Sequence, residues 1–314
     1  MSYHMYMIDT EREYIKTPEA VFAQATEDLS SEGRKNIREQ FENNPNPLLN
    51  LAYHREEHAR LVAERSAKIL QAIQSASPRL VSSRDIALVK LLGTCHDEKQ
   101  LSQAKEVPIG EEKIIKRERD IGENEKQSAL LVIKRMQRKN VTLGRVVFTP
   151  DDMYYTVESY LATIPGFDSK LCTVIQPYLT RHSSLFARAI ALSDLGTAGM
   201  DDPEKCVKEG DAVFREEQMD IHIALLSGEM PSEKTQAFWK DRLLTWTAFQ
   251  EKFIAGREEM LPYELEGLPQ EVKPAVAELF TNFEDAKRCI ADRLEHRRTM
   301  SIPELLLDYG YIPA

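Results

Sequence analysis

The sequence has little of several features that would assign it to a class directly. Of its 314 residues only 13 are glycine and four are cysteine. No stretch approaches the roughly 18 consecutive apolar residues that a membrane-spanning helix needs. The opening MSYHMYMIDTEREYIK contains acids and no apolar core, so it does not resemble a secretory signal. We therefore expect a cytoplasmic protein with no membrane segment.

The cysteines and the charge disfavour two further classes. Cys95, Cys172, Cys206 and Cys289 form no CxxC pair, so we expect reduced thiols and no zinc–thiolate site. Lysine and arginine total 41 against 51 aspartates and glutamates, a net charge of −10. This balance disfavours a nucleic-acid polymer as partner, because its backbone binds an excess of Lys and Arg. A small phosphorylated substrate stays open, since a bound cation can supply positive charge.

Helical patterns dominate the chain. They cover residues 18–41, 48–73, 84–95, 123–139, 151–164, 171–180 and 184–199, and they continue after residue 228. RVVFTP at 145–150 is the clearest strand-like run, and 97–112 is expected to be a loop. We predict an all-α protein, longer than the roughly 250 to 300 residues at which single cores stop growing. Its predicted parts are an N-terminal helical extension (1–47), a metal-binding core (48–228) and a C-terminal helical extension (229–314).

The first candidate for chemistry is YHREEHARLV at 53–62. His54 and His58 are four residues apart, so on one helix both imidazoles leave the same face about a turn apart. Val62 continues that face, which indicates that the face points inward. A single inward histidine is more often a satisfied core residue than a ligand. Two inward histidines at this spacing make a functional site as good an explanation as a pair of satisfied core residues.

Two further stretches can supply ligands. LLGTCHD at 91–97 ends an apolar helix with His96 beside Asp97, for which a helix end stabilised by its dipole is the alternative explanation. Asp194 lies in the apolar stretch 189–199, where a buried carboxylate needs a partner or a cation, or else a helix-end backbone contact. The combined set of imidazoles and carboxylates suits Mn, Fe, Co, Ni or Zn better than Ca or Mg.

The order of these pieces resembles a known family. H…HD…D on successive apolar helices is similar to the HD-domain superfamily of metal-dependent phosphohydrolases. YHREEHARLV resembles the YHNxxHxxxV opening of the branch shared with cyclic-nucleotide phosphodiesterases, GENEKQSA at 122–129 resembles the NExxSA stretch of many small bacterial members, and ALSDLGTAG at 191–199 resembles the closing DADLxxLG. The match spans about residues 50–220. It implies an HD-domain helical bundle with added N- and C-terminal helices.

The resemblance also implies roles for individual residues. The family's metal ligands match four positions of this sequence: His58, His96, Asp97 and Asp194. His54 matches the residue that protonates the leaving oxygen in the phosphodiesterase branch. Glu125 is a candidate for orienting water or a metal-bound ligand, and the alternative is an acid stabilised at a helix N-terminus. Two positions depart from the pattern, with Arg55 where Asn is usual and Ser193 in place of the first Asp of DAD.

The implied activity is hydrolysis of a small phosphorylated metabolite, with a nucleotide favoured, by attack of metal-activated water at phosphorus. The cofactor would be a divalent transition metal (Mn, Fe, Co, Ni or Zn), and Mg can accompany the substrate. We expect neither a membrane nor a nucleic-acid polymer as partner, and the sequence gives no indication of an oligomeric state. The alternatives are a non-catalytic HD-fold sensor or binding protein that keeps its metal site, and a di-iron oxygenase on the same scaffold.

Further residues bear on the size of the site. The basic runs KIIKRER at 113–119 and KRMQRK at 134–139 can attract phosphate, although such runs usually form solvated faces. Glu98 and Glu125 are nearby acids that could bridge two ions, but nothing in their spacing requires it, and His182 is the only further histidine between His96 and Asp194. His182 lies about 120° from Asp194 around an unbroken helix. We therefore predict one tightly held metal per chain, with a second ion at most weakly bound alongside substrate.

Overall fold

The computed structural model describes residues 18–42, 44–110, 112–228 and 232–312. The opening segment MSYHMYMIDTEREYIK, compared above with secretory signals, lies outside the described residues. Within these ranges the protein is mainly helical, with thirteen helices and two small antiparallel hairpins. The prediction of an all-α protein is confirmed as far as a mainly helical fold, and the two hairpins are an addition that was not predicted. None of the helices in the described ranges has the length and hydropathy needed to cross a bilayer.

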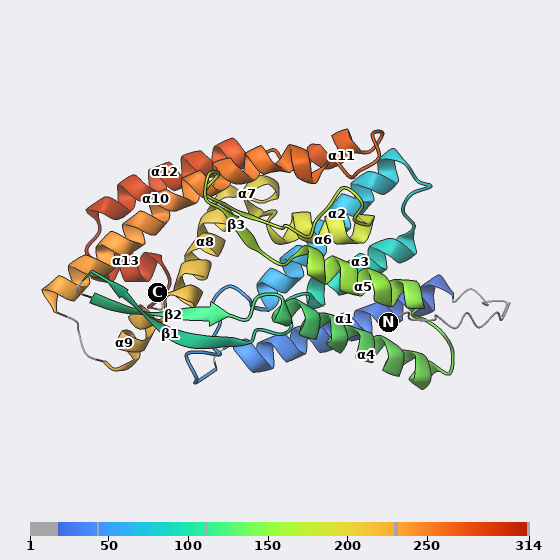
Figure 1. The fold of residues 1–314 in the computed structure, drawn as a ribbon, viewed down its shortest axis with the longest axis horizontal. Coiled ribbons are helices and arrows are strands. Elements are labelled where there is room, and N and C mark those ends of the chain that lie inside the picture. The colour runs from blue at the N-terminus through green and yellow to red at the C-terminus, as the bar shows by residue number, and fades with distance from the viewer. Residues whose placement is uncertain (1–17, 43, 111, 229–231, 313–314) are drawn as a thin grey trace, which may run out of the picture.

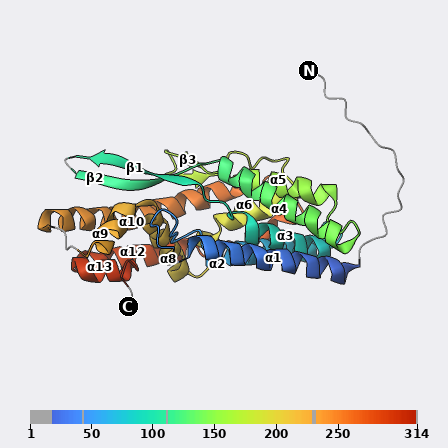
Figure 2. The ribbon, with the colours of Figure 1, turned by 90° about the horizontal axis from the view of Figure 1, so that it is seen from below.

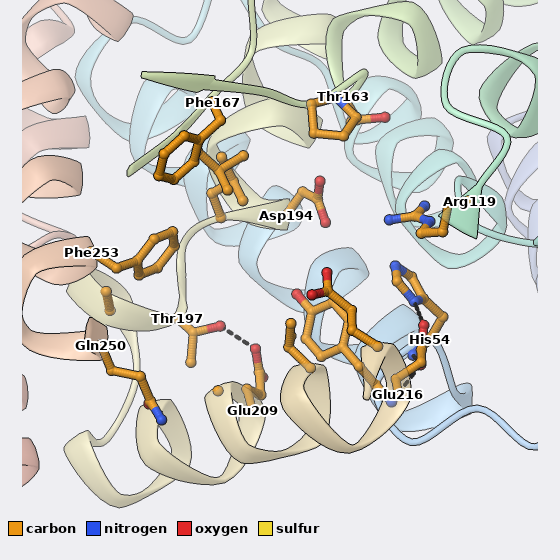
Figure 3. A pocket seen from close by; sticks show the side chains of 18 of the residues that line it. His54, Arg119, Thr163, Phe167, Asp194, Thr197, Glu209, Glu216, Gln250 and Phe253 are labelled. Atoms are coloured by element: carbon orange, nitrogen blue, oxygen red, sulfur yellow. Dashed lines mark hydrogen bonds and ion pairs between the residues drawn. The ribbon is translucent and has the colours of Figure 1, made fainter. Parts of the chain in front are cut away.

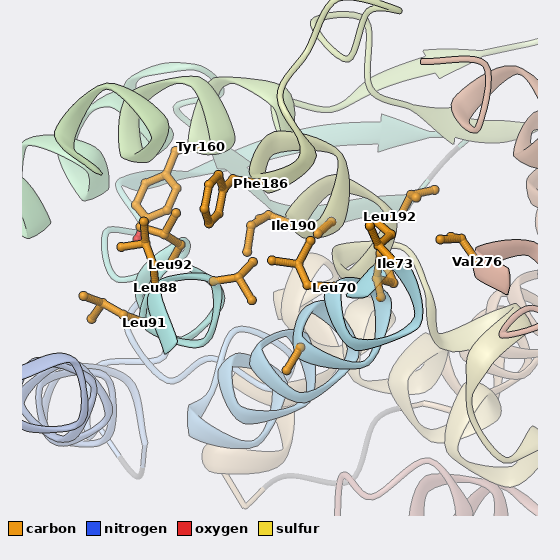
Figure 4. Packing of buried hydrophobic residues seen from close by; sticks show 14 of the residues in the cluster. Leu70, Ile73, Leu88, Leu91, Leu92, Tyr160, Phe186, Ile190, Leu192 and Val276 are labelled. Atoms are coloured by element: carbon orange, nitrogen blue, oxygen red, sulfur yellow. The ribbon is translucent and has the colours of Figure 1, made fainter. Parts of the chain in front are cut away.

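Six helices form the half of the molecule that carries the candidate site (Figure 1). They are α1 (Glu19–Phe41), α2 (Glu56–Ala76), α3 (Ser83–Cys95), α4 (Glu123–Leu143), α5 (Pro150–Ala162) and α6 (Leu185–Asp194). The helix α2 packs against both α3 and α6, while α1 covers α3 and α5 packs between α4 and α6. Figure 4 shows the shared core, in which Leu70, Leu92 and Ile190 meet from three helices. This packing fixes the ends of α2, α3 and α6 relative to one another.

The later helices pack against this half and also extend the molecule beyond it (Figure 1). They are α7 (Thr197–Met200), α8 (Pro203–Glu217), α9 (Met219–Leu226), α10 (Glu233–Glu264), α11 (Lys273–Ala277), α12 (Phe283–Thr299) and α13 (Ile302–Asp308). The long α10 and α12 run side by side along one edge (Figure 1). Ile290 of α12 and Phe22 of α1 belong to the same hydrophobic cluster as Leu70. Helices α1 and α12 therefore share the main core. The predicted domain boundaries at 47/48 and 228/229 stay a prediction.

The two hairpins were not predicted. Strand β1 (Ser102–Ile109) pairs with β2 (Glu112–Arg119), and β3 (Gly166–Asp168) pairs with β4 (Thr173–Ile175). The first hairpin replaces much of the predicted loop 97–112, and β4 lies in the predicted helix 171–180. Viewed from below, the β1–β2 hairpin lies along one side of the molecule (Figure 2), where β2 packs against α8 and α9. It carries the end of the basic run 113–119 to the candidate site.

Three other predictions of local structure need correction. The strand-like run 145–150 is an irregular connection, because Asn140 Oδ1 accepts hydrogen bonds from the backbone of Val147 and Phe148, both at 2.8 Å. The helix predicted from residue 48 begins only at Glu56, after a series of turns. The helix predicted over 184–199 ends at Asp194, and the chain turns before α7. The last two corrections put functional side chains at helix ends.

Candidate metal centre

Four predicted ligands converge where three packed helices end or begin. His58 lies in the first turn of α2, His96 caps the C-terminus of α3 and is followed by Asp97, and Asp194 is the last residue of α6. One donor atom from each residue lies within 4.8 Å of the others. His58 Nε2 is 3.2 Å from Asp194 Oδ1, and His96 Nε2 is 2.9 Å from Asp97 Oδ2. The structure thus brings together all four residues that match the family's ligand set.

A buried arginine holds the end of α6 in place. Arg65 of α2 is 1% exposed, and its Nη1 donates to the carbonyl of Ser193 at 3.1 Å. The same guanidinium pairs with Asp201 and Glu209 from the segment that follows. Asp194 therefore leaves a helix end that is tied directly to the helix carrying His58, and the two side chains are positioned together.

The imidazoles have the hydrogen-bonding pattern of metal ligands. His96 Nδ1 lies 2.8 Å from the carbonyl of Gly93, so Nδ1 carries the proton and Nε2 has a free lone pair. That Nε2 atom and both ring nitrogens of His58 are buried, and no hydrogen-bond partner for them exists among the described residues. Buried polar atoms normally have partners. A divalent transition metal fits this donor set, because it accepts imidazole nitrogen and carboxylate oxygen together.

The charges of the centre favour a cation. Burial raises the pKa of Asp97, but the nearby His96 and His54 outweigh burial and hold the pKa well below its usual range. Burial also raises the pKa of Asp194, but the His58 and His96 imidazoles, 3.2 and 3.4 Å from its carboxylate, outweigh burial and lower that pKa. Burial lowers the pKa of His96, yet the two carboxylates raise it well above its ordinary value. Two ionised carboxylates thus require positive charge at the centre, from protonated imidazole or from a metal ion.

His54 lies near the centre, but it comes from the segment before α2 and not, as the sequence had predicted, from the helix itself. It precedes α2, and Arg55 at the helix N-cap has an extended backbone, so the inference that His54 and His58 share a helical face was wrong. The two rings still lie 5.9 Å apart, measured between centroids. His54 Nε2 is 3.7 Å from Asp97 Oδ2, while Nδ1 bonds to the carboxylate of Glu216.

Glu216 of α8 is a site residue that the sequence analysis missed. It is 3% exposed, and its Oε2 accepts hydrogen bonds from the backbone N–H of Tyr53 at 2.8 Å and of His54 at 3.0 Å. Burial raises the pKa of Glu216, but the interactions with His54 outweigh it and lower the pKa to about 2. Because Glu216 lies 162 residues from His54 in the chain, no local pattern connects the two.

Of the remaining candidates Glu125, Glu98 and His182, only Glu125 lies at the cavity beside the centre. Glu125 caps α4, where its Oε2 accepts from the backbone N–H of Gly122 at 2.6 Å, and it also lines the cavity beside the centre. Glu98 is fully buried and bonded to Asn36 and Arg135, so its carboxylate is satisfied away from the centre. His182 is exposed and accepts from Arg181 Nε at 3.0 Å. Neither Glu98 nor His182 belongs to the ligand cluster.

A cavity of about 680 Å³ opens beside the centre. Figure 3 shows Asp194 between two contrasting walls, with Phe167 and Phe253 on one side and His54 and Arg119 on the other. Trp246 and Phe249 add to the aromatic lining. A ligand in this cavity meets the polar centre at one end and aromatic rings at the other.

Two polar side chains of the cavity wall have hydrogen-bonding capacity to spare. Arg119 Nη2 is 3.8 Å from Asp97 Oδ1, and Arg119 Nε is buried without a partner in the described chain. Gln176 is 6% exposed, and both its amide oxygen and its amide nitrogen lack a partner there. Of the two predicted basic runs, 113–119 thus contributes to the site, whereas in 134–139 Arg135 and Arg138 pair with acids of other segments.

Comparison with known proteins adds no assignment: no family description, no curated protein and no solved structure matches this chain. The likeness to the HD-domain superfamily therefore stays a resemblance carried by the ordered ligand residues. What the site can do chemically follows from its own side chains.

Proposed function

We propose that this protein is a metal-dependent hydrolase of small phosphorylated metabolites, with nucleotides as the substrate class. The observation that carries the proposal is the cluster of two imidazoles and two carboxylates. Three of the four imidazole nitrogens, both of His58 and Nε2 of His96, are buried without a hydrogen-bond partner among the described residues. His58, His96, Asp97 and Asp194 would hold a divalent transition metal (Mn, Fe, Co, Ni or Zn). When bound, such an ion supplies Lewis acidity to a phosphoryl oxygen and to water. An HD-type helical bundle is part of the proposal, supported by the order of the ligands on α2, α3 and α6.

His54 is assigned the role of proton donor to the leaving oxygen. Glu216 holds Nδ1, and this leaves Nε2 directed toward the cavity and the Asp97 carboxylate. A general acid must lie within reach of the leaving group and keep a fixed orientation. The backbone bonds from Tyr53 and His54 to the same carboxylate restrain the whole segment, so the imidazole is oriented before substrate binds.

Arg119 is assigned to the phosphoryl group. A guanidinium presents several N–H donors in a planar fork that suits phosphate oxygens. Arg119 approaches Asp97 and Glu125 no closer than 3.8 and 4.0 Å, which leaves its donors available to a third partner. It supplies positive charge at the centre in a chain of net charge −10.

The rest of the cavity supports a nucleotide over a simple phosphomonoester. A volume of about 680 Å³ lies within the range of sites for drug-sized ligands. Phe167, Phe249 and Phe253 offer apolar faces to a planar base. The amide of Gln176, which has no partner among the described residues, carries an acceptor oxygen beside an NH2 donor, and this pairing matches the edge of a nucleobase.

Metal analysis combined with an activity screen tests the proposal. Purified protein is expected to hold metal by mass spectrometry and to hydrolyse members of a nucleotide panel in a chelator-sensitive manner. Asp194→Ala should lose the metal and the turnover, whereas Asp241→Ala, on the exposed face of α10, should keep both. Full metal content in Asp194→Ala would overturn the ligand assignment. Bound metal without turnover would favour the sensor alternative, and iron with oxygen uptake would favour the oxygenase.

A second experiment tests the substrate class. Gln176→Leu is expected to raise KM for the preferred nucleotide by roughly tenfold, since about one to two hydrogen bonds to the base are lost. Its effect on glycerol phosphate, which has no base, should be small. Equal effects on both substrates would show that Gln176 does not contact a base.

A further inference from the structure

A second cavity is lined by Arg55 and Arg215, the chain neighbours of His54 and Glu216. Its volume is about 380 Å³, and its lining includes Arg55, Arg117, Arg215 and His222. No Asp or Glu lines it in the part of the chain that the structure describes. Such a concentration of basic groups without an acid is unexpected in a chain that carries ten more acidic than basic residues, 51 against 41.

The three guanidinium groups form no direct ion pair with any of the described residues. Among the described residues, no carboxylate oxygen lies within 4.0 Å of the guanidinium nitrogens of Arg55, Arg117 or Arg215. Their hydrogen bonds go to neutral oxygens, namely those of Leu51, Asn50, Glu216 (backbone), Ser102, Pro47 and Gly310. Buried or half-buried charges are costly unless an opposite charge accompanies them.

The basic groups also lie close enough to influence one another. Burial lowers the pKa of His222, and the charges of Arg215, Arg117 and Arg55 lower it further. Arg215 Nε and Tyr311 Oη, both from lining residues, are buried and have no hydrogen-bond partner in the described chain. These two donors are available to a ligand that accepts hydrogen bonds.

We propose that this second cavity binds a phosphorylated small molecule through Arg55, Arg117, Arg215 and Tyr311. Arginine forks recognise phosphate oxygens by paired hydrogen bonds. A cavity of about 380 Å³ is within the range for small ligands, and its concave shape favours a metabolite over a polymer. The site differs from the metal centre, because none of the four candidate metal ligands lines it.

The two sites are joined through one side chain. Arg117 lines both cavities, and its Nε donates to the backbone carbonyl of Glu216 at 3.1 Å. The carboxylate of Glu216 in turn holds His54, and Arg55 is the next residue in the chain. An anion in the second cavity would therefore lie next to the residues that orient the proposed proton donor.

Calorimetric titration of chelator-treated protein with pyrophosphate tests the site without reference to activity. We expect saturable binding at about one site per chain. Arg55→Gln with Arg215→Gln should weaken it by roughly tenfold or more, since charge-assisted hydrogen bonds are lost. Arg119→Gln, which removes a cation from the first cavity only, should leave the affinity of this second cavity unchanged.

Two substitutions at one position distinguish loss of binding from loss of folding. The His222 side chain makes no hydrogen bond to the described residues, so His222→Glu and His222→Gln should both fold, as thermal unfolding would verify. The glutamate should abolish pyrophosphate binding by repulsion, and the glutamine should retain most of it. Absence of saturable binding at millimolar pyrophosphate, or binding that is lost in Arg119→Gln and kept in His222→Glu, would overturn the proposal.

Discussion

Gly93 of α3 lies directly against the backbone of Ala63 in α2. A Cβ atom at Gly93 would stand 2.8 Å from Ala63 Cα and 2.9 Å from Ala63 N. The carbonyl of Gly93 also accepts the hydrogen bond from His96 Nδ1. The same glycine thus permits the close approach of the helices carrying His58 and His96 and sets the orientation of one imidazole.

Gly93→Ala is therefore expected to separate α2 from α3 and to weaken metal binding. Backbone cannot move aside as a flexible side chain can, so stability should fall by about 1 to 3 kcal/mol. Metal affinity should fall on the order of tenfold, the scale seen when ligand orientation is disturbed. Lys90→Ala, on the exposed face of the same helix, should change neither. Denaturant unfolding and metal titration measure the two effects, and wild-type metal affinity in Gly93→Ala would contradict the prediction.

Replacement of the two neighbouring histidines should separate their roles. His58→Ala is expected to lose metal, because both ring nitrogens of His58 lie buried in the centre with no other partner in the described chain. His54→Ala should keep the metal and lose roughly 10²-fold or more of turnover, the usual contribution of a general acid. Metal content by mass spectrometry and kcat on the best substrate distinguish them. Equal metal loss in both variants would make His54 a ligand.

The sequence predicted the ligand cluster because its residues lie in local patterns. His96 and Asp97 are adjacent, and Asp194 interrupts an apolar helix, so each could be identified within a short window. The four-residue spacing of His54 and His58 identified both residues as site candidates. The reason given, a shared helical face, was wrong, since α2 begins after His54. In each case the apolar surroundings indicated burial, and the structure agrees for His54, His58 and His96.

Residues delivered by distant elements could not be predicted in the same way. Glu216 comes from α8 and meets His54 only through tertiary packing. Arg119 reaches the centre on the β1–β2 hairpin. Strand β1 buries no residue, and its sequence SQAKEVPI does not show the alternation of apolar and polar positions that identifies a half-buried strand. Both are charged residues in charged surroundings, where a solvated face is the ordinary expectation.

Cys172 offers a test of the β3–β4 hairpin. It is the one non-glycine residue with positive φ in the described part of the chain, at 52°. The left-handed region costs an L-residue about 1 to 2 kcal/mol, which glycine avoids at the expense of greater freedom when unfolded. Cys172→Gly should thus raise the free energy of unfolding by up to about 1 kcal/mol. Cys172→Val should lower it, and Ser169→Gly in the same loop should give no gain. A marked loss in Cys172→Gly would refute the assigned backbone conformation.

The last prediction concerns the dependence of stability on pH through Glu216. Folding lowers the pKa of this carboxyl from an ordinary value of 4.5 to about 2, because its bonds to His54 outweigh burial. A carboxyl with a depressed folded pKa stabilises the protein fully above its unfolded pKa. That contribution is lost as the pH falls from about 4.5 towards 2.

The comparison that isolates this effect is wild type against Glu216→Gln, both treated with chelator. The difference in unfolding free energy should be largest near neutral pH and should shrink below about pH 4.5, since a protonated glutamic acid resembles glutamine. Glu57→Gln, at an acid of α2 whose side chain is 72% exposed, should show only a small difference throughout. Urea titrations from pH 7 down to the onset of acid unfolding provide the measurement. A wild-type advantage that stays constant across that range would mean that the Glu216 carboxylate is not selectively stabilised in the folded protein.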